Sequence, residues 1–160
     1  MDQPTHCPRL RNWKPPLHIF LPMGLCGHDR VALIVDDEPF ARLSAVQVLV
    51  DQAYLVLEAA DADEALALLH RNDDVSLVVT DIAMPGQMDG LAMARHLRRW
   101  DSSLALVIAT GRAFPDPGEL PPAVEYLEKP YSAHALLHKV RAAEEAVAPI
   151  SGPPLRRRND

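Results

Sequence analysis

Short apolar runs alternate with longer amphipathic stretches from Val31 onward, and this alternation predicts five strands and four helices. Residues 31–35 form an unbroken apolar run that ends in acids, which is typical of a strand buried on both faces. Further strands are expected at 54–58, 75–80, 104–109 and 124–127. Strands that alternate with helices form parallel sheets with right-handed crossovers. The pattern therefore predicts an α/β fold with helices on both faces of the sheet.

Each predicted helix carries an apolar face. The helices are expected at 38–52, from Asp61 through Leu69, at 89–100 and at 132–147. Asp61 is expected to cap the second helix, with Glu64 three residues further on. The expected apolar faces are Leu43, Val46 and Val50; Leu66 and Leu69; Leu91, Ala94 and Leu97; and Leu136, Val140, Ala143 and Val147.

The segment between the fourth and fifth strands is rich in proline. Four prolines, at positions 115, 117, 121 and 122, stand between Ala113 and Pro122. Each proline lacks an amide donor and clashes within a helix interior. We therefore expect no regular helix there, or at most a short turn.

Composition narrows the class of protein. The chain has 160 residues, of which 48% are hydrophobic and 5% aromatic, so one domain with an aliphatic core is expected. A net charge of −6 and a pI near 5.6 argue against direct binding of nucleic acid. No apolar run approaches the roughly 18 residues of a membrane span, and no secretion signal is recognisable. A cytoplasmic protein without membrane insertion is expected.

The domain is expected to cover residues 30–148. Residues 1–29 carry five prolines without sustained periodicity, which predicts an irregular leader. The two cysteines, Cys7 and Cys26, both lie in this leader, so no disulfide framework is expected. Residues 149–160 form a short basic tail, too short for a further output domain.

Chemically active side chains follow four of the predicted strands. Asp36 and Asp37 follow the first strand, Asp81 the third, Thr110 ends the fourth, and Lys129 ends the fifth. In parallel α/β sheets the carboxyl ends of the strands share one edge, where ligands bind. We therefore expect three carboxylates, a hydroxyl and an amine to meet at one site.

This set of residues suits phosphoryl transfer to a carboxylate. Asp81 can attack a phosphoryl donor and form an acyl phosphate, and a divalent cation must then screen the repulsion between anions. Mg²⁺ prefers oxygen ligands, and Asp36, Asp37 and Asp81 supply them. Lys129 and Thr110 can contact the phosphoryl oxygens through a charge and a hydrogen bond.

In their order and spacing, these residues resemble the receiver domain of two-component response regulators, the chemotaxis-regulator-like family. The matching segments are Asp36-Asp37-Glu38, Thr80-Asp81-Ile82-Ala83-Met84-Pro85-Gly86, Asp89-Gly90-Leu91, Thr110-Gly111 and Tyr126-Leu127-Glu128-Lys129-Pro130. The resemblance covers about residues 30–148. It implies a doubly wound, five-stranded parallel sheet of flavodoxin-like order 2-1-3-4-5, in which helix 4 is here irregular or short.

The resemblance also implies residue roles. Asp81 is the phosphoryl acceptor, Lys129 and Thr110 assist it, and the backbone carbonyl of Ala83 joins Asp36, Asp37 and Asp81 around Mg²⁺. Thr110 and Tyr126 form the conformational switch, and Pro130 is a candidate cis-proline. No enzymatic activity is expected beyond the domain's own aspartyl phosphorylation and dephosphorylation.

The implied partners are a sensor histidine kinase or a histidine phosphotransfer protein, and a downstream protein target; a weak homodimer is also compatible with the family. Because helix 4 normally contributes to the output face, the usual partner surface is in doubt.

Two other classes of protein share part of this pattern. A haloacid-dehalogenase-type phosphatase also uses a strand-end Asp, but its nucleophile follows the first strand with a second Asp two residues later, a pattern that Asp36-Asp37-Glu38 lacks. A phosphorylation-independent scaffold commonly loses an acid or the lysine, and none is lost here. The cluster of Arg95, His96, Arg98 and Arg99 is expected on the outer face of a helix, where it could contact an acidic partner. His134 and His138 stand one helical turn apart and are expected on a solvated face; a shared metal is the alternative.

Overall fold

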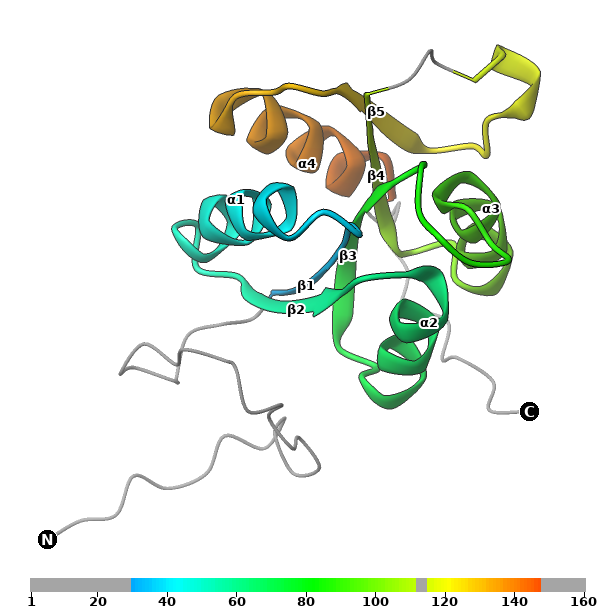
Figure 1. Cartoon of the computed structure of the whole chain (residues 1–160), viewed down its shortest axis with the longest axis horizontal. Helices are drawn as coiled ribbons and strands as arrows, with labels where there is room; N and C mark the ends of the chain where they lie inside the picture. Colours follow the sequence, from blue (N-terminus) through cyan, green and yellow to red (C-terminus); the bar gives the residue numbers. More distant parts are fainter. Residues whose placement is uncertain (1–29, 112–114, 148–160) are drawn as a thin grey trace, which may run out of the picture.

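Five parallel strands form one sheet, which helices cover on both faces (Figure 1). The computed structural model describes residues 30–111 and 115–147. The strands are β1 (Val31–Val35), β2 (Leu55–Ala59), β3 (Val75–Asp81), β4 (Ala105–Thr110) and β5 (Val124–Glu128). Their order is β2-β1-β3-β4-β5, as predicted.

Four helices complete the two outer layers. They are α1 (Pro39–Val50), α2 (Ala62–Arg71), α3 (Gly90–Trp100) and α4 (Ala133–Val147). Along β1 the buried side chains alternate between two cores: Ala32 and Ile34 face α1 and α4, whereas Leu33 and Val35 face α2 and α3. This confirms the predicted double-sided burial.

The predicted cap of α2 is confirmed. The Asp61 side chain accepts a hydrogen bond from the amide of Glu64 at 2.8 Å, and the Glu64 carboxylate accepts one from the amide of Ala60 at 2.8 Å. Asp89 caps α3 in the same way, through the amide of Ala92 at 2.7 Å. Both caps fix the starts of helices that follow strand ends.

The predicted apolar face of α1 is confirmed for Val46, which packs against the core, but is wrong for Leu43 and Val50. The helix buries Ala45 and Leu49, whereas Leu43 is 60% exposed and Val50 38% exposed. Phe40 is 80% exposed. Apolar residues surround most of this helix, so periodicity alone does not select its buried face. In α3 and α4 the predicted inward residues are buried, except Val147, which packs at the edge of the core.

The connection between β4 and β5 lacks a regular helix in its described part, residues 115–123, as predicted. It contains one short 3-10 turn, Pro117–Glu119. In Figure 1 this connection passes beside α3. Residues 112–114, at the start of the proline-rich segment, lie outside the described residues.

Two arginines of α3 form hydrogen bonds with the backbone of this connection. Arg95 donates to the carbonyl oxygen of Glu119 through both Nε (2.8 Å) and Nη2 (2.6 Å). Arg98 donates through Nη2 to the carbonyl oxygen of Ala123 at 2.7 Å. The expectation of a solvated face is therefore wrong for Arg95 and Arg98. We call these two residues the α3 arginine pair. By contrast, His134 and His138 are exposed, as expected.

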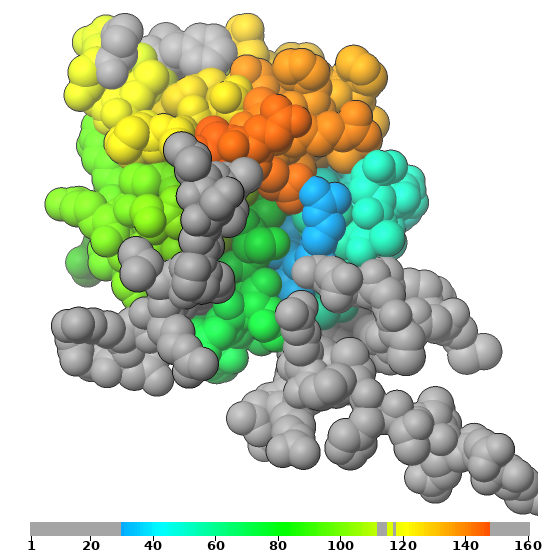
Figure 2. All heavy atoms as spheres, turned by 180° about the vertical axis from the view of Figure 1, so that it is seen from behind, coloured from blue at the N-terminus to red at the C-terminus, as the bar shows by residue number. Residues whose placement is uncertain are grey.

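Side-chain contacts join α4 to the residues that precede β1 and β2. Glu144 of α4 pairs with Arg30 and accepts a hydrogen bond from the Tyr54 hydroxyl at 2.7 Å. Burial, followed by the hydrogen bond to Glu144, raises the pKa of Tyr54. Figure 2 shows α4 against the start of β1 from the opposite side of the molecule. These contacts join α4 to the residue before β1 and to the residue before β2.

Several expectations concern residues beyond those described. The predicted leader (1–29), with both cysteines, and the predicted tail (149–160) belong to this group. Among residues 30–111 and 115–147, no helix has the length and apolar character needed to cross a membrane.

Candidate functional site

The ends of β1 and β3 bring three acids together. Asp36 directly follows β1 and Asp81 ends β3; the two strands are neighbours, with Val35 paired to Thr80. One carboxylate oxygen from each of Asp36, Asp37 and Asp81 lies within 4.8 Å of the others. Asp36 is buried, Asp81 half-buried and Asp37 exposed, so the cluster opens to solvent on one side.

Lys129 bridges two of these acids. Its Nζ donates to Oδ2 of Asp36 at 2.6 Å and to Oδ2 of Asp81 at 2.8 Å. Burial alone lowers the pKa of Lys129, but hydrogen bonds and charges from Asp36 and Asp81 outweigh it, so the pKa lies above its ordinary value. The lysine is therefore a fixed cation at the site. The adjoining Lys129–Pro130 peptide bond is cis, at the proline marked from sequence.

The Asp81 backbone is held by a close contact with Gly90. A β-carbon on Gly90 would lie 1.7 Å from the Asp81 carbonyl oxygen, so a larger residue could enter only if the backbone moved. The Gly90 amide donates to the carbonyl oxygen of Ile82 at 3.0 Å. Oδ1 of Asp81 accepts from the amide of Ala83 at 3.1 Å. These contacts fix both the position and the direction of the carboxylate.

Thr110 and Tyr126 lie on the neighbouring strands. Thr110 ends β4 and is fully buried, and its carbonyl oxygen accepts a hydrogen bond from the amide of Lys129 at 2.9 Å. Tyr126, in β5, is half-buried and packs on the α2 and α3 side of the sheet. Burial raises the pKa of Tyr126, while the charge of Arg95 acts in the opposite direction. The two residues expected to form the switch therefore lie on paired strands.

Sequence reasoning missed three residues of this neighbourhood. Burial, together with the charges of Asp36 and Asp81, raises the pKa of Tyr131, and Lys129 opposes this. The position of Tyr131 directly after Lys129-Pro130 was a visible signal. Gly90 was noted only as part of a family segment, and Arg42, which donates to the Asp36 carbonyl oxygen, gave no signal.

The donor set fits a magnesium ion. Three carboxylates and one ammonium leave the site with a net negative charge, and its ligand atoms are oxygens, which Mg²⁺ prefers. A divalent cation would balance that charge. The side chains that could hold it are those of Asp36, Asp37 and Asp81.

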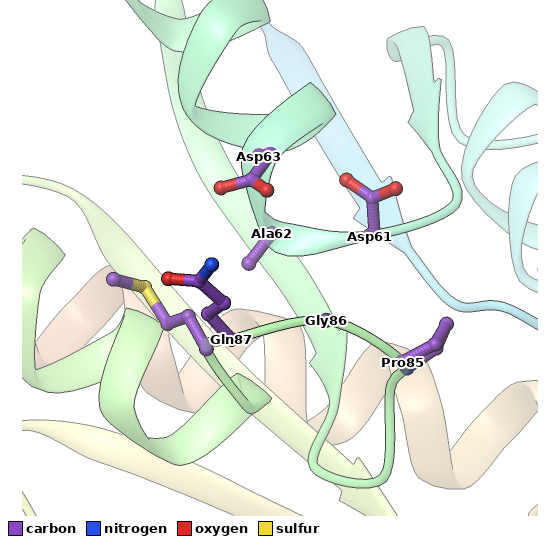
Figure 3. Close-up of a pocket in the computed structure, with 7 residues that line it drawn as sticks. Asp61, Ala62, Asp63, Pro85, Gly86 and Gln87 are labelled. Carbon is purple, nitrogen blue, oxygen red and sulfur yellow. The ribbon is translucent and has the colours of Figure 1, made fainter.

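A hollow in another part of the described structure is lined by none of the site's acids. It has a volume of about 280 Å³ and lies between the start of α2 and the loop after β3 (Figure 3). Its lining residues are Asp61, Ala62, Asp63, Pro85, Gly86, Gln87 and Met88. One of its two acids, Asp61, is already engaged as the α2 cap.

Comparison with known proteins identifies the same pattern. The family model for the response regulator receiver domain matches residues 32–141. Among solved structures, a response regulator receiver protein from Sinorhizobium medicae has a TM-score of 0.69 and 28% identity, covering 74% of this chain and 96% of that one. The chemotaxis response regulator CheY4 of Vibrio cholerae has a TM-score of 0.62 and 26% identity, with 71% and 98% coverage.

Curated relatives are longer proteins. The C4-dicarboxylate transport transcriptional regulatory protein DctD of Rhizobium meliloti is 35% identical over 120 residues, which is 70% of this chain and 25% of the relative. The response regulator MprA of Mycobacterium sp. (strain KMS) is 35% identical over 128 residues, 76% of this chain and 53% of the relative. The chain thus spans between a quarter and about half of these two relatives.

Proposed function

Because the chain belongs to the response regulator receiver domain family, we propose that it accepts a phosphoryl group from a histidine kinase or a histidine phosphotransfer protein on Asp81. The observation that carries this proposal is the cluster of Asp36, Asp37 and Asp81 at the carboxyl edge of the sheet, where Lys129 bridges Asp36 and Asp81. The phosphorylated domain would then bind a downstream protein or pass the phosphoryl group on.

The proposed step is a direct displacement at phosphorus. A carboxylate oxygen of Asp81 forms a bond to phosphorus while the bond to the donor histidine nitrogen breaks, and the released imidazole takes up a proton. Lys129 would stabilise the charge on the phosphoryl oxygens, and the Thr110 hydroxyl would donate a hydrogen bond to one of them. Attack of water on the acyl phosphate reverses the modification and releases inorganic phosphate.

We propose Mg²⁺ as the cofactor, held by Asp36, Asp37, Asp81 and the carbonyl oxygen of Ala83. The cation would supply charge neutralisation for an anionic nucleophile that meets an anionic phosphoryl group. The protein's own contribution is to hold the acceptor carboxylate still, through Ala83 and Gly90, before the donor arrives.

Acetyl phosphate tests this function without a partner protein. With Mg²⁺ present, the full chain is expected to gain one phosphoryl group, and hydroxylamine should remove it because it cleaves acyl phosphates. Intact-mass measurement reports both outcomes, and EDTA should suppress the labelling. A label that survives hydroxylamine would contradict an aspartyl phosphate.

The exposed end of α1 is the surface that we propose contacts the phosphoryl donor protein. Phe40 stands three residues after Asp37 and is 80% exposed, and Leu43, one turn further, is 60% exposed. A protein that delivers a phosphohistidine to Asp81 must cover the surroundings of the acidic site. Large apolar side chains there would be buried in that complex, which is where their transfer free energy stabilises binding.

Replacing Phe40 with Ala is expected to slow phosphotransfer from the cognate kinase about tenfold, since an apolar anchor typically contributes 1–2 kcal/mol or more. Labelling by acetyl phosphate should change less than about twofold, because that donor needs no docking surface. Val50→Ala is the matched control: it removes an exposed apolar residue about 15 Å away along the same helix. Equal slowing with both donors would place Phe40 in the reaction site, against docking.

A further inference from the structure

The side chain of Arg42, in α1, contacts the backbone of the acidic site. Its Nη1 donates to the carbonyl oxygen of Asp36 at 2.6 Å, and its Nε donates to the carboxylate of Glu58, in β2, at 3.1 Å. The Arg42 side chain is only 19% exposed, so water competes poorly for these bonds. One guanidinium therefore joins α1, the end of β1 and β2.

The carbonyl group that Arg42 holds belongs to the peptide unit between Asp36 and Asp37. Because a peptide unit is planar, its orientation restricts the directions in which the side chains of both residues extend from the backbone. Asp36 has further restraints: its amide donates to the Ala59 carbonyl oxygen at 3.1 Å, and its Oδ1 accepts from the Glu38 amide at 3.0 Å. Asp37 is exposed, so its placement depends more strongly on this peptide unit.

The positive charge of Arg42 also favours the acidic site. A guanidinium is permanently cationic and forms strong hydrogen bonds in a fixed planar geometry. It lies beside a cluster of three carboxylates, two of which Lys129 bridges. Its presence reduces the cost of gathering like charges while leaving their oxygens available for a ligand.

We propose that Arg42 is a positioning residue for the divalent-cation site, acting on Asp36 and Asp37 without touching the ion itself. This inference rests on the proposed function, which places Mg²⁺ among Asp36, Asp37 and Asp81. Residues that orient metal ligands typically change metal affinity by about 10- to 100-fold when they are removed.

Calorimetric titration of the full chain with Mg²⁺ tests the proposal. Arg42→Ala is expected to raise the Mg²⁺ dissociation constant about tenfold. Arg42→Lys keeps the charge but loses the planar fork, and about a threefold rise is expected. Glu58→Gln removes the ion pair and leaves the bond to the Asp36 carbonyl oxygen, so its value should stay within about twofold of the wild type. Asp37→Ala, which removes a ligand, should abolish binding.

A kinetic measurement separates positioning from direct participation. Labelling of Arg42→Ala by acetyl phosphate should slow at low Mg²⁺ and recover once Mg²⁺ is saturating. Urea denaturation of each variant reports whether it is folded. If Arg42→Ala does not fold, Arg42→Lys and Glu58→Gln decide the question: equal dissociation constants within about twofold would overturn the proposal.

The outcomes distinguish this inference from the function on which it rests. Mg²⁺ binding by the wild type that is unchanged in Arg42→Ala overturns the role of Arg42 and leaves the proposed function intact. Slower labelling of Arg42→Ala that persists at saturating Mg²⁺ also overturns a role confined to the cation site. Absence of Mg²⁺ binding by the wild type refutes the proposed cofactor and this inference together.

Discussion

Asp81→Asn is expected to abolish phosphorylation of this protein by acetyl phosphate and by a histidine kinase. Asparagine retains the shape of the side chain but replaces the nucleophilic carboxylate with an amide, which cannot form an acyl phosphate. Asp36 and Asp37 lie close by, but both follow β1, whereas Asp81 is the acid that ends the central strand β3. Intact-mass measurement after incubation with Mg²⁺ and acetyl phosphate should show no added group.

Loss of labelling must be separated from loss of folding. Asp81→Asn removes one of three clustered negative charges, so its free energy of unfolding in urea should not fall by more than about 1 kcal/mol, although Lys129 loses one charged partner. Asp74→Asn is the matched control, because Asp74 is exposed and directly precedes β3, at the opposite end of that strand. The control should be labelled like the wild type. Stoichiometric labelling of Asp81→Asn would refute the assignment of the acceptor.

The fold and the acidic cluster were predictable because the relevant signals are local. The apolar run of β1 ends at Asp36, and the longer run of β3 ends at Asp81. In a parallel sheet such ends meet at one edge regardless of how the helices pack. The sequence positions of the acids were therefore enough to bring their side chains together.

The errors concern contacts that depend on packing. The α1 helix is apolar around most of its circumference, and its rotation is selected by the close packing of Ala45 and Leu49 on the sheet. Arg95 and Arg98 stand in a run of basic residues, which by itself indicates a solvated face. Their acceptors, the carbonyl oxygens of Glu119 and Ala123, are distant in sequence, and the nearer acceptor of Arg42 is also a backbone carbonyl oxygen. Every residue carries a carbonyl group, so no sequence pattern marks those that bind an arginine.

One residue of the α3 arginine pair, Arg98, is expected to contribute strongly to stability. Arg98→Ala is expected to lower the free energy of unfolding by about 2 kcal/mol, because it removes a charged donor from two carbonyl oxygens, those of Ser102 and Ala123. Burial lowers the pKa of the Arg98 guanidinium, against the effect of Asp101, which agrees with a partly desolvated group. Urea denaturation monitored by circular dichroism measures the change.

Ala123 explains why this contact matters locally. Its φ angle is +54°, a left-handed conformation that costs a residue other than glycine about 1–2 kcal/mol. The bond from Arg98 holds Ala123 in that conformation directly before β5, the strand that carries Tyr126. Without it, residues 115–123 should exchange their amide hydrogens faster, and the exchange should extend into the start of β5.

Arg99→Ala is the control for this prediction, because Arg99 lies in the same last turn of α3 but is exposed and donates to the Arg95 carbonyl oxygen within its own helix. Both variants lose a favourable charge at the helix C-terminus, so their difference in stability reports the bonds of Arg98 to Ser102 and Ala123, and the exchange of residues 115–123 reports the bond to Ala123. The Arg99→Ala change in the free energy of unfolding should stay within about 0.5 kcal/mol.

Beryllofluoride, which mimics the phosphoryl group on Asp81, should alter amide hydrogen exchange in residues 115–123 of the wild type if Thr110 transmits the signal to this segment. Equal stability and exchange in the two arginine variants would show that the connection holds its conformation without α3, and the route from Asp81 to Tyr126 would then have to run through the sheet alone.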